Sequence, residues 1–513
     1  MRDQAQKSVV RFETLGCKLN QIESEGAARA FADRGFDCRM TGVAASSPVD
    51  TDTVLCIVNT CTVTAKAEQK CRRMIRLLLE KYPASAVLVT GCYAQLDGSL
   101  LLAMDDRIAV LGGKSKDALV KLPAFLTSFI DRRTDSQSPA GIQAENAAEN
   151  VSFPLALAGE LRRLYAQSFE DARHPGELGK TQRLKPVFAK SAPAPVEKAG
   201  TAFALSTDTF LQHSRPSLKI QDGCDSRCSY CRICLARGSS VSLNPETVLS
   251  RVLQLEKMGH REVVLTGVNL GQYGFSGITG LLGFLLDNTK AISLRLSSLH
   301  PQIVDEKLCA VLAHERVRPH FHLSVQSGSD AVLSAMKRPY RSQSVYTAVE
   351  HLRRIKKKPF IACDIIAGFP GETQADFNET LELCRTCEFS WIHAFPFSPR
   401  PGTEAFSMKN AVRASEVKNR IRELSNLALA QKKAYIESCI GKDFKAVVEK
   451  YRIGQLRAVT ENFLHVQIQN GAREPAPASK YENLGGQEVL LRIDAVHESG
   501  LHGEECEAFA SFI

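Results

Sequence analysis

The sequence contains no hydrophobic run long enough to cross a membrane. Its longest apolar stretch, from Leu281 to Leu286, is interrupted by Gly283 and falls far short of the roughly 18 residues that a spanning helix needs. The N-terminal sequence MRDQAQKSVVRFETLG also lacks the apolar segment of a secretory signal. We therefore expect a cytoplasmic protein that does not bind a membrane.

A strong charge of one sign is also absent. The 513 residues carry a formal charge of +9, which permits an anionic partner such as RNA but does not require one. Hydrophobic residues at 44% and charged residues at 24% are typical of globular proteins. A chain of this length exceeds one ordinary core and predicts about three domains.

Cysteine, in contrast, is abundant, with 16 residues. The cytosol keeps thiols reduced, so we do not expect disulfides. Cys384 and Cys387 are spaced like half of a zinc site, but without a second pair nearby we do not expect zinc there. These two and seven others are interpreted as small buried residues, namely Cys38, Cys56, Cys71, Cys309, Cys363, Cys384, Cys387, Cys439 and Cys506.

Residues 8–125 alternate short apolar strands with helical patterns, which predicts a parallel α/β domain. Three of these strands end in a cysteine: Cys17, Cys61 and Cys92. Ligands of an open parallel sheet bind beyond the carboxyl ends of its strands, so these thiols are expected to converge at one edge. Because all three occupy the same structural position, we favour a shared metal or cluster site over unrelated buried thiols.

Residues 215–410 contain six strand–helix repeats, which predict an open, partial (β/α)6 barrel. Cys224, Cys228 and Cys231 follow its first strand in a C-x3-C-x2-C run, at the mouth where barrel sites form. Three thiolates can bind three irons of a cubane cluster, which leaves the fourth iron open to activate a small molecule. Cys234 adds a ferredoxin-like C-x2-C-x2-C spacing. We favour Cys224 over Cys234, because Cys224 begins the run directly after the strand.

Five further positions in the barrel are candidate cofactor contacts: Tyr230, Gly267, Arg295, Ser297 and Gln326. Tyr230 lies in the cysteine loop and can cover a cluster or an adenine. Gly267 and Gln326 stand at strand ends, where backbone can approach a ligand closely. Arg295 and Ser297 share one face of a strand. Arg295 suits the carboxylate or ribose of a ligand and a structural ion pair equally well.

The remaining segments differ in composition. Residues 130–214 are rich in Ser, Pro and Gln, with one helix-like pattern at 159–172, and are interpreted as a partly disordered linker or insertion. A helical connector at 411–439 leads to a predicted small β-barrel at 440–513. This barrel has 8 Lys and Arg against 11 Asp and Glu, a net charge of −3. Any RNA contact is therefore expected on a local face, around Lys442, Lys445, Lys450 and Arg452.

Both cysteine trios and the motifs TLGCKLN, VNTCTVT, TGCYAQ and IIAGFPGET resemble the radical S-adenosylmethionine (SAM) methylthiotransferase family, over residues 8–125 and 215–513. The resemblance implies an N-terminal cluster domain, a radical SAM barrel and a C-terminal TRAM-like barrel that contacts RNA. It also implies two [4Fe-4S] clusters. An auxiliary cluster would be held by Cys17, Cys61 and Cys92, and a SAM-binding cluster by Cys224, Cys228 and Cys231.

The implied reaction uses SAM twice, once to methylate a sulfur on the auxiliary cluster and once to form a 5′-deoxyadenosyl radical. The radical takes hydrogen from C2 of an adenine in tRNA, and a methylthio group replaces it. An electron donor and a sulfur source are implied partners. The GCKLN motif is similar to the branch that acts on N6-threonylcarbamoyladenosine beside the anticodon. Isopentenyladenosine or a ribosomal-protein side chain is the alternative substrate, and a non-catalytic iron–sulfur RNA-binding protein is the least favoured reading.

Overall fold

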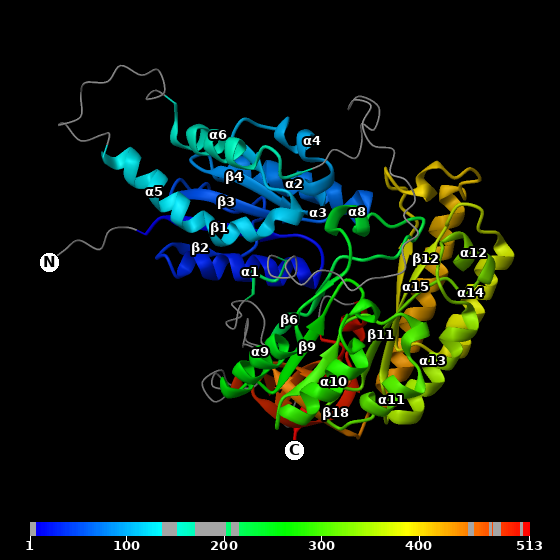
Figure 1. Cartoon of the computed structure of the whole chain (residues 1–513). Coiled ribbons are helices and arrows are strands. Elements are labelled where there is room, and N and C mark those ends of the chain that lie inside the picture. Colours follow the sequence, from blue (N-terminus) through cyan, green and yellow to red (C-terminus); the bar gives the residue numbers. More distant parts are fainter. Residues whose placement is uncertain are drawn as a thin grey trace.

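The computed structural model describes residues 7–135, 151–169, 202–206, 215–449, 456–470, 474–475, 484–502 and 506–513. Within them the chain forms an N-terminal parallel sheet, a central open barrel and a C-terminal closed barrel (Figure 1). This architecture confirms the fold class that the sequence predicts. The residue boundaries between the domains stay predictions.

The N-terminal sheet has five parallel strands in the order β2-β1-β3-β4-β5. They are β1 (Val9–Thr14), β2 (Asp37–Arg39), β3 (Thr53–Thr60), β4 (Ala86–Gly91) and β5 (Ile108–Val110). One face is covered by α1 (Lys18–Ala32), α5 (Leu122–Asp135) and α6 (Phe153–Tyr165). The other face is covered by α2 (Ala65–Lys81), α3 (Cys92–Leu96) and α4 (Gly98–Leu102). Because helices lie on both sides, the apolar runs of β3 and β4 are almost entirely buried.

Helix α6 lies inside the segment that the sequence predicts to be a linker. Leu157, Leu161 and Tyr165 recur at helical spacing and are buried in the core of the N-terminal domain. The helix-like pattern at 159–172 thus corresponds to a helix that begins earlier, at Phe153. Part of the predicted linker is therefore a core helix, and the Pro- and Ala-rich stretch at 186–200 lies outside the described residues.

The central barrel is built from six parallel strands in chain order. They are β6 (Ser217–Lys219), β9 (Glu262–Thr266), β10 (Ser293–Leu296), β11 (His320–Gln326), β12 (Phe360–Ala367) and β13 (Trp391–Pro396). Parallel bridges from Leu294 to Val317 and from Leu299 to Leu323 connect the two halves. The helices between the strands are α9 (Pro245–Lys257), α10 (Gly277–Asn288), α11 (Glu306–Leu312), α12 (Asp330–Ala335), α13 (Ser342–Ile355) and α14 (Gln374–Cys387). The predicted partial (β/α)6 barrel is confirmed.

Helix α15 (Ala414–Glu437) leads to the C-terminal barrel. Its strands are β14 (Asp443–Val448), β15 (Arg457–Thr460), β16 (His465–Asn470), β17 (Glu474–Pro475), β18 (Glu488–Val496) and β19 (Ala508–Phe512). Pairing of β15 with β16 closes the ring β15-β14-β18-β19-β16. The turn between β15 and β16 brings Phe463 against the central barrel, where its ring stacks on His320 with centroids 4.1 Å apart.

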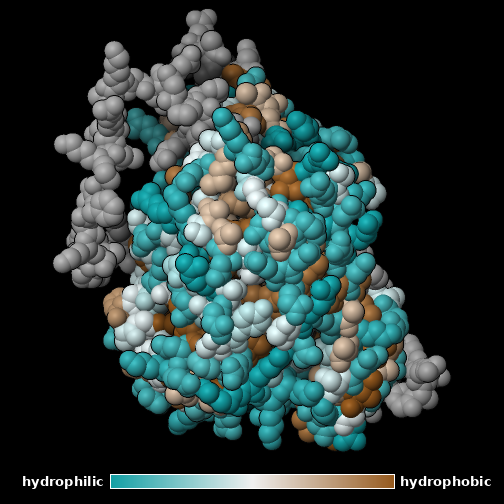
Figure 2. Space-filling model, turned by 90° about the vertical axis from the view of Figure 1, so that its right-hand side faces the viewer, coloured by the Kyte–Doolittle hydropathy of each residue, from teal (hydrophilic) through white to brown (hydrophobic). Residues whose placement is uncertain are grey.

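The face turned toward the viewer in Figure 2 is largely hydrophilic, and its hydrophobic patches are small and separate. Across the described ranges, no helix combines the length and the apolar character that crossing a bilayer requires.

Leu161→Ala is expected to weaken the N-terminal domain, because it leaves a cavity beneath α6. Such changes in protein cores cost about 2–5 kcal/mol. Leu164→Ala on the same helix, where the side chain is 55% exposed, should alter the free energy of unfolding by less than about 0.5 kcal/mol. Hydrogen exchange of the β4 and β5 amides measures both variants. Equal protection in the two would show that α6 does not support the sheet.

Candidate active site where three domains meet

A cavity of about 830 Å³ is lined by residues from all three domains. The N-terminal domain contributes its three predicted ligands, Cys17, Cys61 and Cys92. The central barrel contributes Gly267 and Ser297, just beyond the carboxyl ends of β9 and β10. The C-terminal barrel contributes side chains that include Phe463 and His465. A ligand in this cavity could therefore contact residues of all three domains.

The three N-terminal cysteines converge as the sequence predicts. Each follows the carboxyl end of one of the strands β1, β3 and β4. Gly16 has a φ of +114°, and a Cβ there would lie 2.7 Å from the Cβ of Cys61, so glycine allows the first two loops to approach. Burial raises the pKa of the Cys61 thiol to about 12, and the nearby thiols of Cys92 and Cys17 also contribute to this increase.

The central cysteine loop runs from β7 (Gln221–Asp222) to α8 (Ile233–Arg237). Burial raises the pKa of the Cys231 thiol to about 12. The nearby thiols of Cys228, Cys234 and Cys224 also contribute to this increase. All four thiols of the loop therefore lie close together, Cys234 included. Helix α8 packs on α3 (Figure 1), and Leu235 and Ala236 cluster with Cys92 and Leu96. The loop is thus held beside the N-terminal trio.

Both groups of thiols have the ligand chemistry that iron–sulfur clusters use. In the part of the chain that the structure describes, no three His, Cys, Asp or Glu side chains form a group that would hold a metal ion. A cubane cluster instead places each thiolate on a different iron, which requires thiols that are near one another but spread. Two N–H groups also donate to thiol sulfurs, and hydrogen bonds of this kind tune the reduction potential of iron–sulfur clusters. Asn269 Nδ2 donates to Cys224 Sγ (3.9 Å), and Arg338 Nη1 donates to Cys228 Sγ (3.3 Å). The ligand roles of the six cysteines stay predictions.

The five further predicted contacts have different surroundings, and two of them line the cavity, Gly267 and Ser297. Tyr230 packs in a small apolar cluster instead. Gln326 is buried at the end of β11, with a φ of +70°. Arg295 forms the ion pair that the sequence left open, since its Nε donates to Glu262 Oε1 at 2.7 Å. Their roles as cofactor contacts stay predictions.

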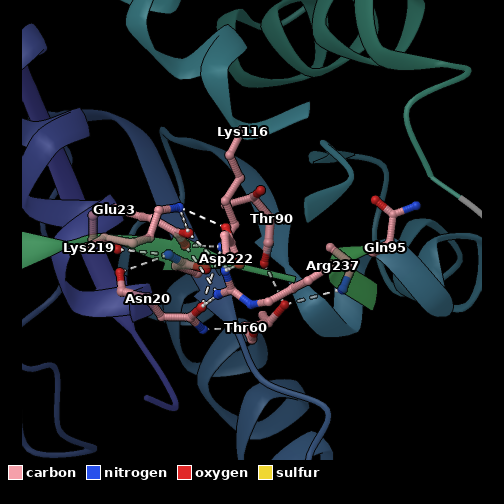
Figure 3. Close-up of polar contacts among 12 residues, drawn as sticks. Asn20, Glu23, Thr60, Thr90, Gln95, Lys116, Lys219, Asp222 and Arg237 are labelled. Carbon is pink, nitrogen blue, oxygen red and sulfur yellow. Dashed lines mark hydrogen bonds and ion pairs between the residues drawn. The ribbon is translucent and has the colours of Figure 1, made fainter. Parts of the chain in front are cut away.

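A buried ion network joins the N-terminal domain to the central cysteine loop (Figure 3). Glu23 of α1 accepts hydrogen bonds from Lys219 Nζ (2.9 Å) and Arg237 Nη1 (3.0 Å). Lys116 pairs with the other oxygen of Glu23. Asp222, at the start of the cysteine loop, accepts from Lys219 (2.8 Å) and Arg237 (2.9 Å). Three cations thus meet two carboxylates, and they tie α1 to α8.

A second ion network joins the same two domains. Arg232 directly follows the central trio, and its Nη1 donates to Thr62 Oγ1 (3.1 Å), directly after the second N-terminal cysteine. The same nitrogen pairs with Glu68 (3.1 Å) and Asp97 (3.3 Å). Arg400, in the loop after β13, also pairs with Glu68. The end of the central cysteine loop is therefore fixed to the loop that follows Cys61.

The sequence analysis missed both networks. The available signal was charge in apolar surroundings: Lys219 interrupts the apolar run of β6, and Glu23 lies on the buried face of α1. These two residues are 196 positions apart, so nothing local indicates that they pair.

Known proteins resemble the chain along most of its length. The Radical SAM superfamily matches residues 218–384, and the Uncharacterized protein family UPF0004 matches residues 9–113. A protein named Threonylcarbamoyladenosine tRNA methylthiotransferase MtaB from Treponema pallidum is 45% identical over 90% of this chain and 94% of its own length. The chain belongs to the radical SAM methylthiotransferase family.

Two further relatives place this methylthiotransferase within that family. A protein with the same MtaB name from Thermotoga maritima is 33% identical, over 86% of this chain and 87% of its own. A tRNA-2-methylthio-N(6)-dimethylallyladenosine synthase from Bartonella tribocorum is 30% identical over 86% of each chain. Membership makes the protein a SAM-dependent radical transferase and implies SAM and a [4Fe-4S] cluster as cofactors.

Glu23→Gln is expected to lower the free energy of unfolding by about 3–5 kcal/mol at neutral pH, because three buried cations lose a carboxylate. Burial opposes ionisation of Glu23, but Arg237, Lys116 and Lys219 outweigh it and hold its pKa well below 4.5. The carboxylate therefore stabilises the fold fully above pH 4.5. Its contribution should shrink as the pH falls further below that value.

Chemical denaturation of the cluster-free chain, from neutral to acidic pH, measures this difference. The control is Glu404→Gln, which removes an exposed ion pair with Lys337 and should change stability by less than about 1 kcal/mol. A gap between wild type and Glu23→Gln that stays constant into acidic pH would contradict the assignment of the carboxylate as charged.

Proposed function

We propose that this methylthiotransferase attaches a methylthio group to C2 of N6-threonylcarbamoyladenosine, beside the anticodon of tRNA. The relatives of that name support the substrate. The observation that carries the proposal is a cavity lined by all three domains and by the N-terminal cysteine trio. Buried ion networks hold the loop of the central trio beside that trio. Replacing hydrogen on an aromatic carbon by sulfur needs a radical source and a sulfur source close to the same atom.

The cysteines of this chain would hold both groups. Cys224, Cys228 and Cys231 would bind a [4Fe-4S] cluster that leaves one iron open for SAM, and Cys17, Cys61 and Cys92 would bind a second one. When bound, these groups and SAM supply the radical and the sulfur chemistry. Asn269 and Arg338 would stabilise the negative charge on the thiolates through their hydrogen bonds to the sulfurs.

The cavity wall suits a purine base. Phe360, Trp391 and Phe463 line it together with four histidines, His320, His322, His393 and His465. Burial lowers the pKa of His393 to about 4 and that of His465 to about 3, so both rings are neutral at physiological pH. Flat, uncharged side chains can stack on a base, and their bulk excludes water from a reactive radical.

The proposed partners follow from this reaction. The tRNA would enter beside the C-terminal barrel, where Lys442 and Lys445 are exposed, whereas Lys450 and Arg452 lie outside the described residues. The reaction also requires an electron donor and a source of sulfur. Because the proposed substrate is tRNA in the cytoplasm, we propose that the protein works there.

Deleting the gene is expected to remove the methylthio group from N6-threonylcarbamoyladenosine while leaving the parent nucleoside in tRNA. Mass spectrometry of nucleosides from total tRNA measures both. Loss of the methylthio group from isopentenyladenosine instead would assign the protein to the other tRNA branch. Unchanged tRNA nucleosides would contradict tRNA as the substrate.

Two cysteine variants should separate the roles of the trios. Cys228→Ala should abolish 5′-deoxyadenosine formation by the reduced, reconstituted protein, whereas Cys92→Ala should retain it and lose methylthio transfer. Iron content should fall from about eight to about four per chain in either variant, because each would lose one four-iron cluster. Cys309→Ala, at a buried thiol of the central core, is the control and should keep all three properties. Retention of full iron by Cys92→Ala would remove the second cluster from the proposal.

A further inference from the structure

We infer that the cavity contains a subsite for a carboxylate, with Lys18 as the residue that contacts it. The inference rests on the proposed function, because the carboxylate is that of the threonyl group on N6 of the substrate. Lys18 directly follows Cys17 in the chain and lines the same cavity.

Lys18 differs from the other cations of the cavity because no described residue forms an ion pair or hydrogen bond with its ammonium group. Arg237 is held by Glu23 and Asp222, and Lys432 pairs with Glu507 at 2.6 Å. Arg457 also has an interaction partner. Among the described residues, Lys18 alone of these four lining cations makes no hydrogen bond or ion pair. The pairing of the other three leaves Lys18 as the cation available to a ligand.

Two arginines lie close to Lys18, around the same aromatic ring. Three cations surround the ring of Phe463: Lys18 Nζ lies 6.0 Å from its centroid, Arg215 Cζ 5.3 Å and Arg295 Cζ 5.2 Å. Glu262 is the carboxylate that binds Arg295 (2.7 Å) and lies 3.7 Å from Arg215.

Glu449 also lines the cavity and attracts Arg215. Arg318, the remaining arginine on Glu262, pairs with Glu488 and Glu461 as well. The Nη1 atoms of Arg215 and Arg295 are buried and make no hydrogen bond to any described residue. An anion entering beside Lys18 would give its ammonium group an ion-pair partner, in a site where water screens charge poorly.

The position of Lys18 matches the shape of the substrate. In adenine, C2 and the N6 group both flank N1 on the Watson–Crick edge. A base that turns C2 toward Cys17, Cys61 and Cys92 therefore turns its N6 substituent toward the same wall of the cavity. Lys18 stands on that wall and can form a charge-assisted hydrogen bond with a carboxylate on the substituent. A substituent without charge would leave the ammonium group unpaired, which disfavours such a substrate.

The test compares two anticodon stem-loop RNAs in the reconstituted enzyme. One carries N6-threonylcarbamoyladenosine, and the other carries the same nucleoside with its carboxylate converted to a primary amide. Lys18→Met should raise the KM and the Kd for the carboxylate RNA roughly 10- to 100-fold, the loss expected for a hydrogen bond to a charged group. The amide RNA should bind the wild type weakly and bind Lys18→Met no worse. Lys18→Arg should restore part of the difference.

The controls separate this subsite from other roles of Lys18. Iron content and uncoupled formation of 5′-deoxyadenosine should be unchanged in Lys18→Met, and Lys357→Met, at an exposed lysine outside the cavity lining, should behave as wild type. Equal weakening of both RNAs, or loss of 5′-deoxyadenosine, would overturn the subsite. If the wild type modifies the carboxylate RNA and Lys18→Met does so with unchanged KM, the subsite proposal is wrong and the proposed function still stands. If the wild type does not modify it, the proposed function fails.

Discussion

Burial of charge between the two cysteine-bearing domains is the constraint on which the rest of the structure depends. Glu23 and Asp222 are removed from water, and their cations come from both domains: Lys116 from one, Lys219 and Arg237 from the other. A buried charge that loses its partner is strongly destabilising. The domains therefore cannot shift relative to each other without exposing or unpairing these groups, and the two cysteine trios keep a fixed relation.

That fixed relation suits the chemistry of a methylthiotransferase. The radical source and the sulfur source have to act on one carbon atom, so the loops proposed to hold them must not move apart. Arg232 and Thr62 hold two of these loops together. Each directly follows a predicted cluster ligand, and a hydrogen bond of 3.1 Å joins them. The ion networks thus connect the stability of the fold to the geometry of the site.

Each domain contributes a different kind of side chain to the cavity. The N-terminal domain supplies thiols and a cation, the central barrel supplies histidines and glycine, and the C-terminal barrel supplies Phe463 and His465. The C-terminal barrel is acidic as a whole, yet the turn that it inserts beside the central barrel meets a group of arginines and Lys18. Overall charge therefore says little about the chemistry of this face, because only the residues that reach the cavity matter.

Much of the fold and the cysteine part of the site could be predicted, because both depend on local patterns. Strands β3 and β4 are apolar runs bounded by turns, and a cysteine at the end of each must arrive at one edge of a parallel sheet. Helix α6 was partly predicted, as the helix-like pattern at 159–172. The composition around it concealed that the spaced Leu157, Leu161 and Tyr165 belong to the core.

The sequence by itself thus determined the order of the elements, the two cysteine trios and the family. Only the tertiary structure decided which charges pair, which cation is left without a partner, and what lines the cavity. The physical reason is distance along the chain. Helical and strand periods act over a few residues, whereas Glu23 meets Lys219 across 196 residues, and Lys18 meets Phe463 only once three domains have packed.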